Sequence, residues 1–541
     1  MFRMRLNSRS LARAGAAGMA LGWAIAGWAG DAARPSVLLN PDDFRHYVDS
    51  LGRNDPEDGN YSIPNAGAWE WMKSNIPFFS CPDSDVELTY YYRWWAYRKH
   101  IEKTPAGFII TEFLRHVDHA TDYNAISCAL GHHIAEGRWL HDSRYLNDYI
   151  AFWLHSGEGG GLQSHFHQFS GWTADALYDR WLADGNTPYL LSQLDALQRD
   201  YHAWEQERLT ESGLFWQRDV SDGMEESISG GRRVKNIRPT INSYLYGDAK
   251  ALAAIAALAG NSRLRAEYER KAAGLRKLVE ERLWDREAGF FETVLESGGF
   301  AGVREEAGYT PWYFNLPEPG KGYEEAWKQL MDPKGFYAPF GPTTAERRHP
   351  QFQIADHGDD CQWNGPSWPF ATTITLRALA NVLNGYSQNA VSNQDYWQTF
   401  LIYTRSQRLK LDNGQVAPWV DENLDPLTGE WWARALKIRK KTFYGRGDHY
   451  NHSAYADLVI TGVVGLRPHA GSVVEVNPLA PADEWEWFGL DGVPYHGHLL
   501  AILWDRNGTH FGKGKGLRIF ADGKEIAHSA TLARTTGRLM R

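Results

Sequence analysis

Residues 241–259 (INSYLYGDAKALAAIAALA) and 262–284 (SRLRAEYERKAAGLRKLVEERLW) decide the fold of this chain. In both stretches apolar side chains recur every three or four positions, which is the spacing of one buried face of an α-helix. Only Gly260 and Asn261 separate the two stretches, and these residue types are typical of helix ends and starts. The pair therefore predicts a helical hairpin.

Helices of this kind recur along the chain. The same spacing predicts helices over residues 143–155, 187–207, 366–384, 394–407 and 454–466. Two helices also end in a similar phrase, because ERL at 207–209 leads to GLFW at 213–216 and ERLW at 281–284 leads to GFF at 289–291. Such an echo is typical of toroids in which each helical hairpin returns to the same rim. We therefore predict a mainly α fold, an (α/α)6 six-hairpin barrel over residues 35–468, whose rim loops converge on one site.

The sequence changes character after Arg467. Residues 473–476 (VVEV), 499–503 (LLAIL) and 517–520 (LRIF) alternate or run apolar between turns, as strands do. Residues 469–541 are therefore predicted to form a small β-rich C-terminal domain.

The N-terminus has the pattern of a secretory signal. Four arginines precede an apolar run over residues 14–29, and Gly27-Trp28-Ala29 fits the small-x-small rule for cleavage. We expect residues 1–29 to be a signal peptide and the mature protein to be periplasmic or secreted. The alternative is a retained anchor, because the run approaches the lower limit of about 17 residues for a spanning helix.

Composition excludes several classes of function. The net charge of -9 comes from 57 basic and 66 acidic residues without long runs, so we expect no nucleic-acid partner. The 24 Trp suit a carbohydrate substrate, because an indole offers a flat apolar face and one N–H donor; large helical barrels also use Trp as core filler. Three Cys without metal-type spacing predict no metal and no cofactor. No stable membrane partner is expected.

The densest acidic segment is DVSDGMEESIS at 219–229, directly after an aromatic stretch. Glycosidic bonds break through an oxocarbenium-like transition state, so one neutral acid protonates the leaving oxygen while a second carboxylate handles water or the anomeric carbon. A loop that crowds four carboxylates can raise the pKa of one of them through like charge and burial. The alternative is a solvated acidic turn.

Three further loops mix turn residues with polar and aromatic side chains. They are DDCQWNGPSWP at 359–369, GRGDHYNH at 445–452 and HFHQFSGW at 165–172. The first is suited to wall a pocket. In the second, Asp448 is the one carboxylate, with helix capping as the alternative role. In the third, the histidines can bind sugar hydroxyls or can be hydrogen-bonded within the structure.

These segments carry a resemblance to a known group of enzymes. The order DGME at 222–225, INSYLY at 241–246, WNGPSW at 363–368 and DHYN at 448–451 resembles the six-hairpin glycosidases, namely glycoside hydrolase family 63, mannosylglycerate hydrolase and trehalase. In that group a "G-aromatic-or-Met-D" element supplies the general acid and a late "E-x-Y-N" element supplies the general base of an inverting hydrolysis. The resemblance implies that Glu225 is the acid and Asp448 the base. This chain has Glu where the group has Asp at the acid position, and Asp where the group has Glu at the base position.

We therefore expect an exported, exo-acting glycoside hydrolase that cleaves a terminal bond, with α-glucosides or arabinofuranosides as substrate types. The expected substrate-binding residues lie in the same loops and in the aromatic stretch at 90–95. They are Asp222, Glu226, Trp216, Arg93, His167, Trp363, Asn364, Trp368, His449, Tyr450 and Asn451.

Two other functions are compatible with the sequence. A polysaccharide lyase on a related toroid could use Arg446, His449, Tyr450 and Asn451 to neutralise and deprotonate a uronate, but the acidic loop at 219–226 argues against a polyanionic substrate. A non-catalytic carbohydrate-binding protein is the other alternative. The distinguishing feature is whether two carboxylates face one pocket.

Overall fold

The structure is a computed structural model of the chain. It describes residues 38–540 except 58, 356–360, 412 and 443–444. The predicted signal peptide lies outside the described residues. Among the residues that are described, no helix combines the length and the apolar character needed to cross a bilayer.

Six helices form a closed inner ring. They are α4 (Leu130–Gly137), α6 (Thr173–Asp184), α9 (Pro239–Leu258), α11 (Thr310–Tyr313), α12 (Pro369–Gly385) and α15 (Tyr455–Leu458). Each helix contacts the next in this order, and α15 contacts α4 again. α15 continues into a π-helical turn, η8 (Val459–Val463), where the sequence predicts an uninterrupted helix.

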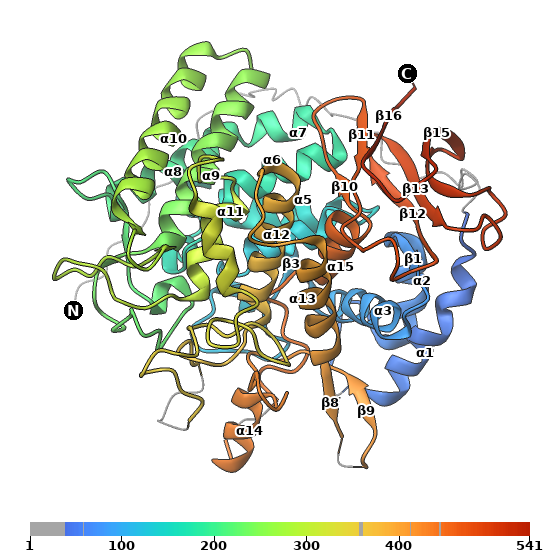
Figure 1. The fold of residues 1–541 in the computed structure, drawn as a ribbon, viewed down its shortest axis with the longest axis horizontal. Coiled ribbons are helices and arrows are strands. Elements are labelled where there is room, and N and C mark those ends of the chain that lie inside the picture. Colours follow the sequence, from blue (N-terminus) through green and yellow to red (C-terminus); the bar gives the residue numbers. More distant parts are fainter. Residues whose placement is uncertain (1–37, 58, 356–360, 412, 443–444, 541) are drawn as a thin grey trace, which may run out of the picture. The chain divides into compact units, whose positions relative to one another are not determined.

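Before each inner helix comes an outer one. These are α3 (Ser84–Lys99), α5 (Arg144–His155), α8 (Leu194–Arg208), α10 (Ser262–Arg282), the 3-10 helix η7 (Tyr323–Gln329) and α13 (Asn393–Ser406). The predicted helix at 187–207 is divided at Gln193 into α7 (Thr187–Ser192) and α8. The predicted hairpin at 241–284 is α9 and α10, which lie side by side (Figure 1). The Asn261 side chain accepts a hydrogen bond from the Leu264 N–H and so begins α10.

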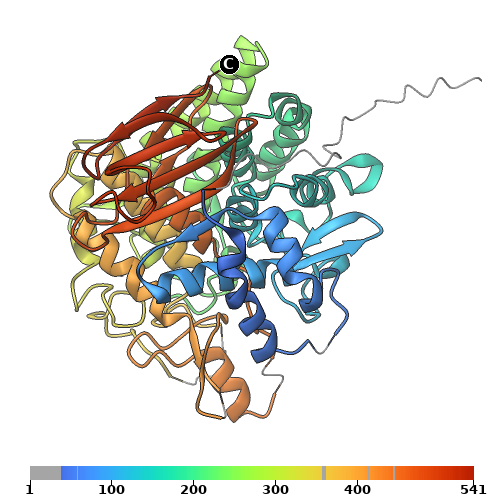
Figure 2. The same ribbon diagram turned by 90° about the vertical axis from the view of Figure 1, so that its right-hand side faces the viewer.

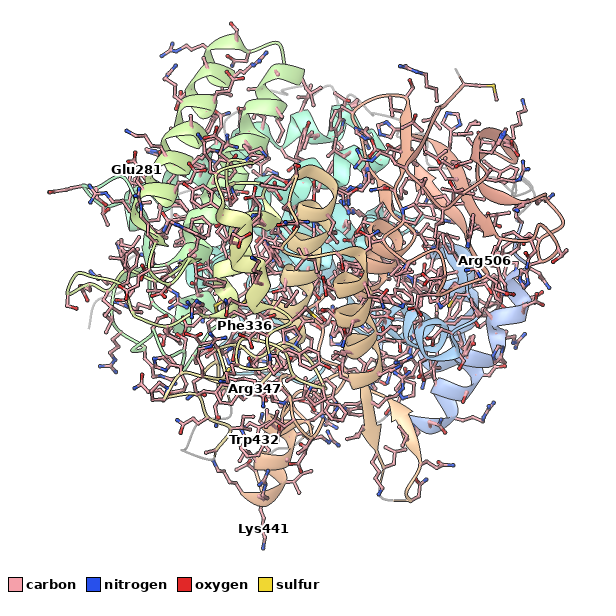
Figure 3. All side chains as sticks on the ribbon, in the orientation of Figure 1. Glu281, Phe336, Arg347, Trp432, Lys441 and Arg506 are labelled. Atoms are coloured by element: carbon pink, nitrogen blue, oxygen red, sulfur yellow. The ribbon has the colours of Figure 1, made fainter. Side chains whose placement is uncertain are left out.

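Short elements complete the helical part. The remaining helices are η1 (Pro41–Phe44), α1 (Arg45–Asn54), α2 (Asn65–Asn75), η2 (Asp122–Asn124), η3 (Glu158–Gly160), η4 (Phe166–Gln168), η5 (Val220–Asp222), η6 (Glu306–Tyr309) and α14 (Trp432–Arg439). Figure 1 shows α14 beyond one end of α12 and α13, and in Figure 3 Lys441 projects away from the molecule close to this helix.

Four two-stranded hairpins follow outer helices. They are β2 (Ile101–Thr104) with β3 (Gly107–Ile110), β4 (Trp216–Gln217) with β5 (Asn236–Ile237), β6 (Trp284–Asp285) with β7 (Phe290–Phe291), and β8 (Arg408–Lys410) with β9 (Val416–Pro418). The repeated phrase in the sequence therefore corresponds to a repeated structural feature, in which an outer helix closes into a short hairpin.

The C-terminal region forms two antiparallel sheets (Figure 2). One has the order β1 (Phe78–Ser80), β12 (Trp487–Tyr495), β13 (His498–Asp505), β14 (Gly516–Ala521) and β15 (Lys524–Ser529). The other has the order β10 (Leu466–Arg467), β11 (Val473–Val476) and β16 (Thr535–Arg538). The expected β-rich region is present, but β1 comes from the N-terminal part of the chain, with Phe79 opposite Leu490. The fold class predicted from the sequence is confirmed.

Candidate active site

The acidic loop after β4 is tied back on itself. Asp219 accepts hydrogen bonds from the N–H groups of Val220 (2.7 Å) and Gly231 (3.0 Å). A side chain at position 230 would collide with this carboxylate, because a Cβ there would lie 2.0 Å from Asp219 Oδ2. Glu226 has a left-handed backbone, with φ of 59°. The loop therefore presents Glu225 from a constrained backbone.

The two other predicted acidic residues of this loop are already paired. Asp222 is buried and accepts hydrogen bonds from Arg238 Nε (2.7 Å) and from the Thr240 hydroxyl at the start of α9. Glu226 is half-buried and pairs with Arg232 at 2.8 Å. Asp222 therefore anchors the loop to the inner ring, and Glu226 lies on its outer side.

Glu225 joins this loop to the one before α12. Its backbone carbonyl accepts a hydrogen bond from the N–H of Trp363 (3.0 Å), and its Oε2 accepts one from the Cys361 thiol (3.3 Å). Cys361 is half-buried. The structure therefore brings together the first two loops that the sequence singled out.

A carboxyl group that the sequence reasoning missed lies within electrostatic range of Glu225. Glu112 follows β3, and its side chain is buried and accepts a hydrogen bond from the Tyr450 hydroxyl. Burial raises the pKa of Glu112 to about 8, and the negative charges of Glu422 and Glu225 act in the same direction. Both of those carboxylates are therefore within electrostatic range of Glu112.

Glu422 is the second missed carboxylate. It is buried, and it accepts hydrogen bonds from Lys437 Nζ (2.9 Å) and Arg446 Nη2 (2.8 Å). Although burial opposes its charge, Lys437 and Arg446 lower the pKa of Glu422 to about 2. A sequence signal for it exists, because Asp421 and Glu422 directly follow the β8–β9 hairpin, as the acidic loop follows β4.

Asp448 and Glu422 both act electrostatically on Asp421, the residue before Glu422 in the chain. Asp448 Oδ1 accepts a hydrogen bond from Arg434, and its side chain is 22% exposed. Its charge, together with burial and the charge of Glu422, raises the pKa of Asp421 to about 7. Asp421, Glu422 and Asp448 thus form a carboxyl cluster that α14 supplies with Arg434 and Lys437.

Two of the predicted binding residues, Arg93 and His449, make hydrogen bonds within the protein. Arg93 is buried, and its guanidinium donates to Ser453 (2.6 Å to the carbonyl), Tyr403 and Gln407. His449 bridges the Tyr92 hydroxyl (2.9 Å) and Asp55 (3.0 Å). These contacts occupy their polar atoms, so the structure gives them no evident site for a sugar.

Two further predicted binding residues, Asn451 and His167, also make contacts within the protein. The Asn451 amide donates to the Thr111 carbonyl (3.2 Å), and its own carbonyl contacts His133 (2.6 Å). His167 stacks on Trp204 of α8 and contacts Asp200 (2.7 Å) and Glu207. Burial disfavours its charge, but the two carboxylates raise the pKa of His167 to about 9.

Trp216 lies at the surface end of β4, half-buried, with three cations over its ring. Arg208 (4.6 Å), Lys235 (4.7 Å) and Arg218 (5.9 Å) surround the indole.

An aromatic wall borders the carboxyl groups. Trp363 stacks on Trp368 with ring centroids 4.6 Å apart, and Phe370 at the start of α12 packs edge-on against Trp363. Asn364 is buried beside Trp363, and its carbonyl accepts a hydrogen bond from Gln353 N (3.0 Å). The wall continues through His452, which lies 3.8 Å from the Tyr450 ring.

Several buried polar atoms, in this wall and in other segments, lack a hydrogen-bond partner among the described residues. They are Glu112 Oε2, Ser127 Oγ, both ring nitrogens of His132 and His452, Asp222 Oδ1, the Tyr244 hydroxyl, and Nε1 of Trp172 and Trp363. Buried polar groups are almost always hydrogen-bonded in folded proteins. Atoms of this kind, next to several carboxyl groups, therefore suit a polar guest such as a sugar or ordered water.

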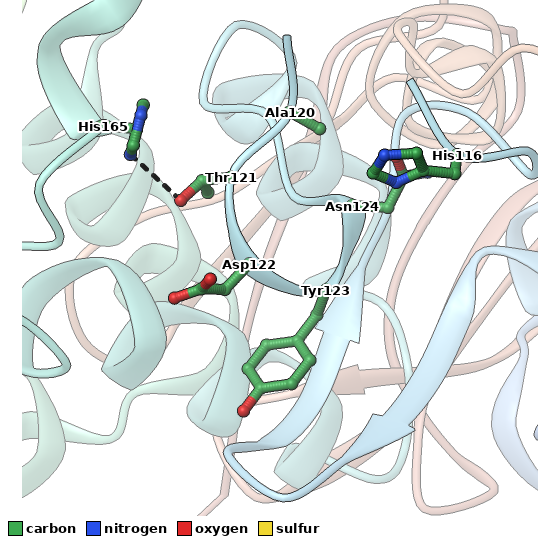
Figure 4. Close-up of a pocket in the computed structure, with 7 residues that line it drawn as sticks. All are labelled: His116, Ala120, Thr121, Asp122, Tyr123, Asn124 and His165. Carbon is green, nitrogen blue, oxygen red and sulfur yellow. Dashed lines mark hydrogen bonds between the residues drawn. The ribbon is translucent and has the colours of Figure 1, made fainter. Parts of the chain in front are cut away.

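Two surface hollows lie near these loops. One, of about 500 Å³, is lined by residues of the 219–233 segment, including Glu226 and Arg233. The other, of about 600 Å³, is lined by His116, Ala120, Thr121, Asp122, Tyr123, Asn124 and His165. Figure 4 shows His165 hydrogen-bonded to Thr121 at one side of this second hollow.

The described residues include no group of three or more His, Cys, Asp or Glu placed to hold a metal ion. Cys81 and Cys128 are buried thiols, and Cys361 is half-buried.

Comparison with known proteins places the chain among glycoside hydrolases. Residues 122–453 match the model of the mannosylglycerate hydrolase MGH1-like glycoside hydrolase domain, and residues 466–528 match the C-terminal domain of glycosyl hydrolase family 65. The first match covers more than half of the chain. Glu422 lies within it, whereas Glu112 precedes it.

Solved structures show the same fold. A protein described as a sialidase is 47% identical with a TM-score of 0.87, over 92% of this chain and 45% of that one. An uncharacterised conserved protein from Thermus thermophilus is 14% identical with a TM-score of 0.51, over 69% and 99%. The family 78 rhamnosidase of Bacillus sp. GL1 is 13% identical with a TM-score of 0.53, over 82% and 41%.

This chain belongs to the MGH1-like family of glycoside hydrolases. It spans less than half of the length of the sialidase that it resembles. The resemblance to six-hairpin glycosidases noted in the sequence is confirmed.

Proposed function

We propose that this protein is an exo-acting, inverting glycosidase in which Glu225 is the general acid. The observation that carries the proposal is the pair formed by Glu225 and Glu422, which act together on the pKa of buried Glu112. Inversion needs an acid and an ionised base on opposite sides of the bond. Lys437 and Arg446 favour the ionised form of Glu422, whereas the neighbours of Glu225 include the thiol of Cys361.

Two carboxylates are candidates for the base. The sequence motif favours Asp448, and the contacts favour Glu422. Glu422 is buried and shares Glu112 as a neighbour with Glu225, whereas Asp448 pairs with Arg434 and neighbours Asp421. We therefore propose Glu422 as the base and Asp448 as the alternative.

The proposed substrate is a neutral terminal sugar of an oligo- or polysaccharide. The stacked pair Trp363 and Trp368, next to Phe370, supports an apolar wall for one ring face. The relatives' names indicate mannosylglycerate, rhamnosides and, for the protein described as a sialidase, sialic acid glycosides; α-glucosides and arabinofuranosides are the types expected from the sequence. A wall built around one ring supports exo action.

A screen of 4-nitrophenyl glycosides tests the activity. We expect one glycoside among the α-glucoside, α-mannoside, α-rhamnoside and α-arabinofuranoside to be cleaved. Proton NMR of the first product should show the anomer opposite to that of the substrate. A product that keeps the configuration would contradict inversion, and cleavage of none of the four would contradict the proposed substrate types.

We further propose that the protein is exported. The arginines before the apolar run at 14–29 and the site Gly27-Trp28-Ala29 support this. Protein expressed with its native N-terminus in a Gram-negative host should be recovered from the periplasm or medium, with its mature sequence starting close to Gly30. Recovery of only full-length cytoplasmic chain would contradict the proposal.

A further inference from the structure

Glu112 has two carboxyl oxygens in different situations. Oε1 accepts the hydrogen bond from Tyr450, whereas Oε2 is buried and has no hydrogen-bond partner among the described residues. The residue is 4% exposed. A backbone bond from Asn451 N to the Glu112 carbonyl (3.0 Å) holds the segment in place.

The charged and titratable groups around Glu112 do not compensate a negative charge on it. Those within electrostatic range are Glu225, Glu422, Tyr450, Arg446, Cys128 and Tyr149. Arg446 is the one cation among them, and it pairs with both oxygens of Glu422. Burial and the like charges of Glu225 and Glu422 therefore disfavour the ionised form of Glu112.

We propose that Glu112 is a substrate-binding residue whose Oε2, carrying a proton, donates a hydrogen bond to a hydroxyl of the terminal sugar. This inference rests on the proposed function, because the sugar that Glu112 binds is the one on which Glu225 and Glu422 are proposed to act. Glu112 is within electrostatic range of both the proposed acid and the proposed base but shares neither role, since a carboxyl group that is neutral in the free enzyme is a donor rather than a base. The substrate class is thereby narrowed to sugars that have a free hydroxyl where the terminal ring faces Glu112 Oε2.

The protonation state can be tested without any substrate. Because the pKa of Glu112 is raised from the usual 4.5 to about 8 in the folded chain, its contribution to stability is complete below pH 4.5 and is lost as pH rises toward about 8. Glu112→Gln cannot ionise. The melting temperature of Glu112→Gln minus that of the wild type should therefore increase steadily between pH 5 and pH 8. A difference that stays constant over this range would overturn the proposal.

The binding role is tested by three variants on the aryl glycoside that the enzyme cleaves. Glu112→Gln keeps a donor, so KM should stay within about threefold of the wild type, whereas Glu112→Met removes the donor and should raise KM at least about tenfold. Glu102→Gln, the same change on neighbouring β2, is the matched control and should leave KM unchanged. Above pH 8 the wild type should lose affinity and Glu112→Gln should not.

Other outcomes separate this inference from the proposed function. Loss of turnover in Glu112→Gln would overturn it, because an ionised Glu112 would then be required. If no glycoside is cleaved, binding of glucose, mannose, rhamnose and arabinose is measured by saturation-transfer NMR. Binding of one sugar to the wild type and Glu112→Gln but not to Glu112→Met would support the inference while the proposed activity fails. Equal binding to all three proteins, or to none, would overturn it.

Discussion

Glu225→Gln is expected to reduce kcat for a glycoside with a sugar leaving group by about 10²- to 10⁴-fold, the usual contribution of a general acid. A sugar alkoxide leaves poorly unless it is protonated, and glutamine cannot supply the proton. With a 4-nitrophenyl leaving group, which barely needs protonation, the loss should be about tenfold or less. Steady-state kinetics on both kinds of substrate measure the difference.

Glu226→Gln provides the matched control. Glu226 is adjacent to Glu225 but pairs with Arg232 on the outer side of the loop. We expect its replacement to affect both substrates similarly and weakly. If Glu225→Gln cleaved both substrates at wild-type rates, the acid assignment would fail. Asp222 would be a poor replacement, because Arg238 and Thr240 already occupy one of its oxygens.

Glu422→Gln should reduce kcat on both kinds of substrate alike, by about 10²- to 10⁴-fold, because water must be activated whatever group leaves. Asp448→Asn should cost about tenfold or less. Azide is expected to restore part of the turnover of Glu422→Gln by replacing the water. The reverse ranking of the two variants would assign the base to Asp448, as the sequence motif predicts.

Folding must be checked in this comparison, because Glu422 balances buried Lys437. Removing one partner of a buried ion pair costs about 3 to 5 kcal/mol. Melting temperatures of the two variants separate loss of structure from loss of chemistry. A second variant, Lys437→Met, keeps Glu422 while removing one of its two cations. We expect it to raise the pKa of Glu422 and thus to move the acidic limb of the kcat/KM profile to higher pH.

Local sequence patterns indicated some of the segments that form the proposed site. The acidic loop at 219–226 was evident because its carboxylates are adjacent in sequence and follow an aromatic strand. The WNGPSW segment was interpreted from the sequence as a pocket wall, and in the structure it contacts the acidic loop through the hydrogen bond from the Trp363 N–H to the Glu225 carbonyl. Local sequence patterns could not show whether the polar atoms of Arg93 and His449 are available to a substrate. Their partners, Ser453 and Asp55, are distant in the chain, so only the folded structure shows that their polar atoms are occupied.

The sequence by itself determined the helical repeat, the β-rich C-terminal region and the glycosidase class, because each depends on periodicity or on a short motif. Only the tertiary structure decided which carboxyl groups share a site. Glu112 and Glu422 are 310 positions apart, and the charge of Glu422 raises the pKa of Glu112 because the inner ring closes between α15 and α4. The physical reason is that burial and like charge depend on distances in space, which no local pattern encodes.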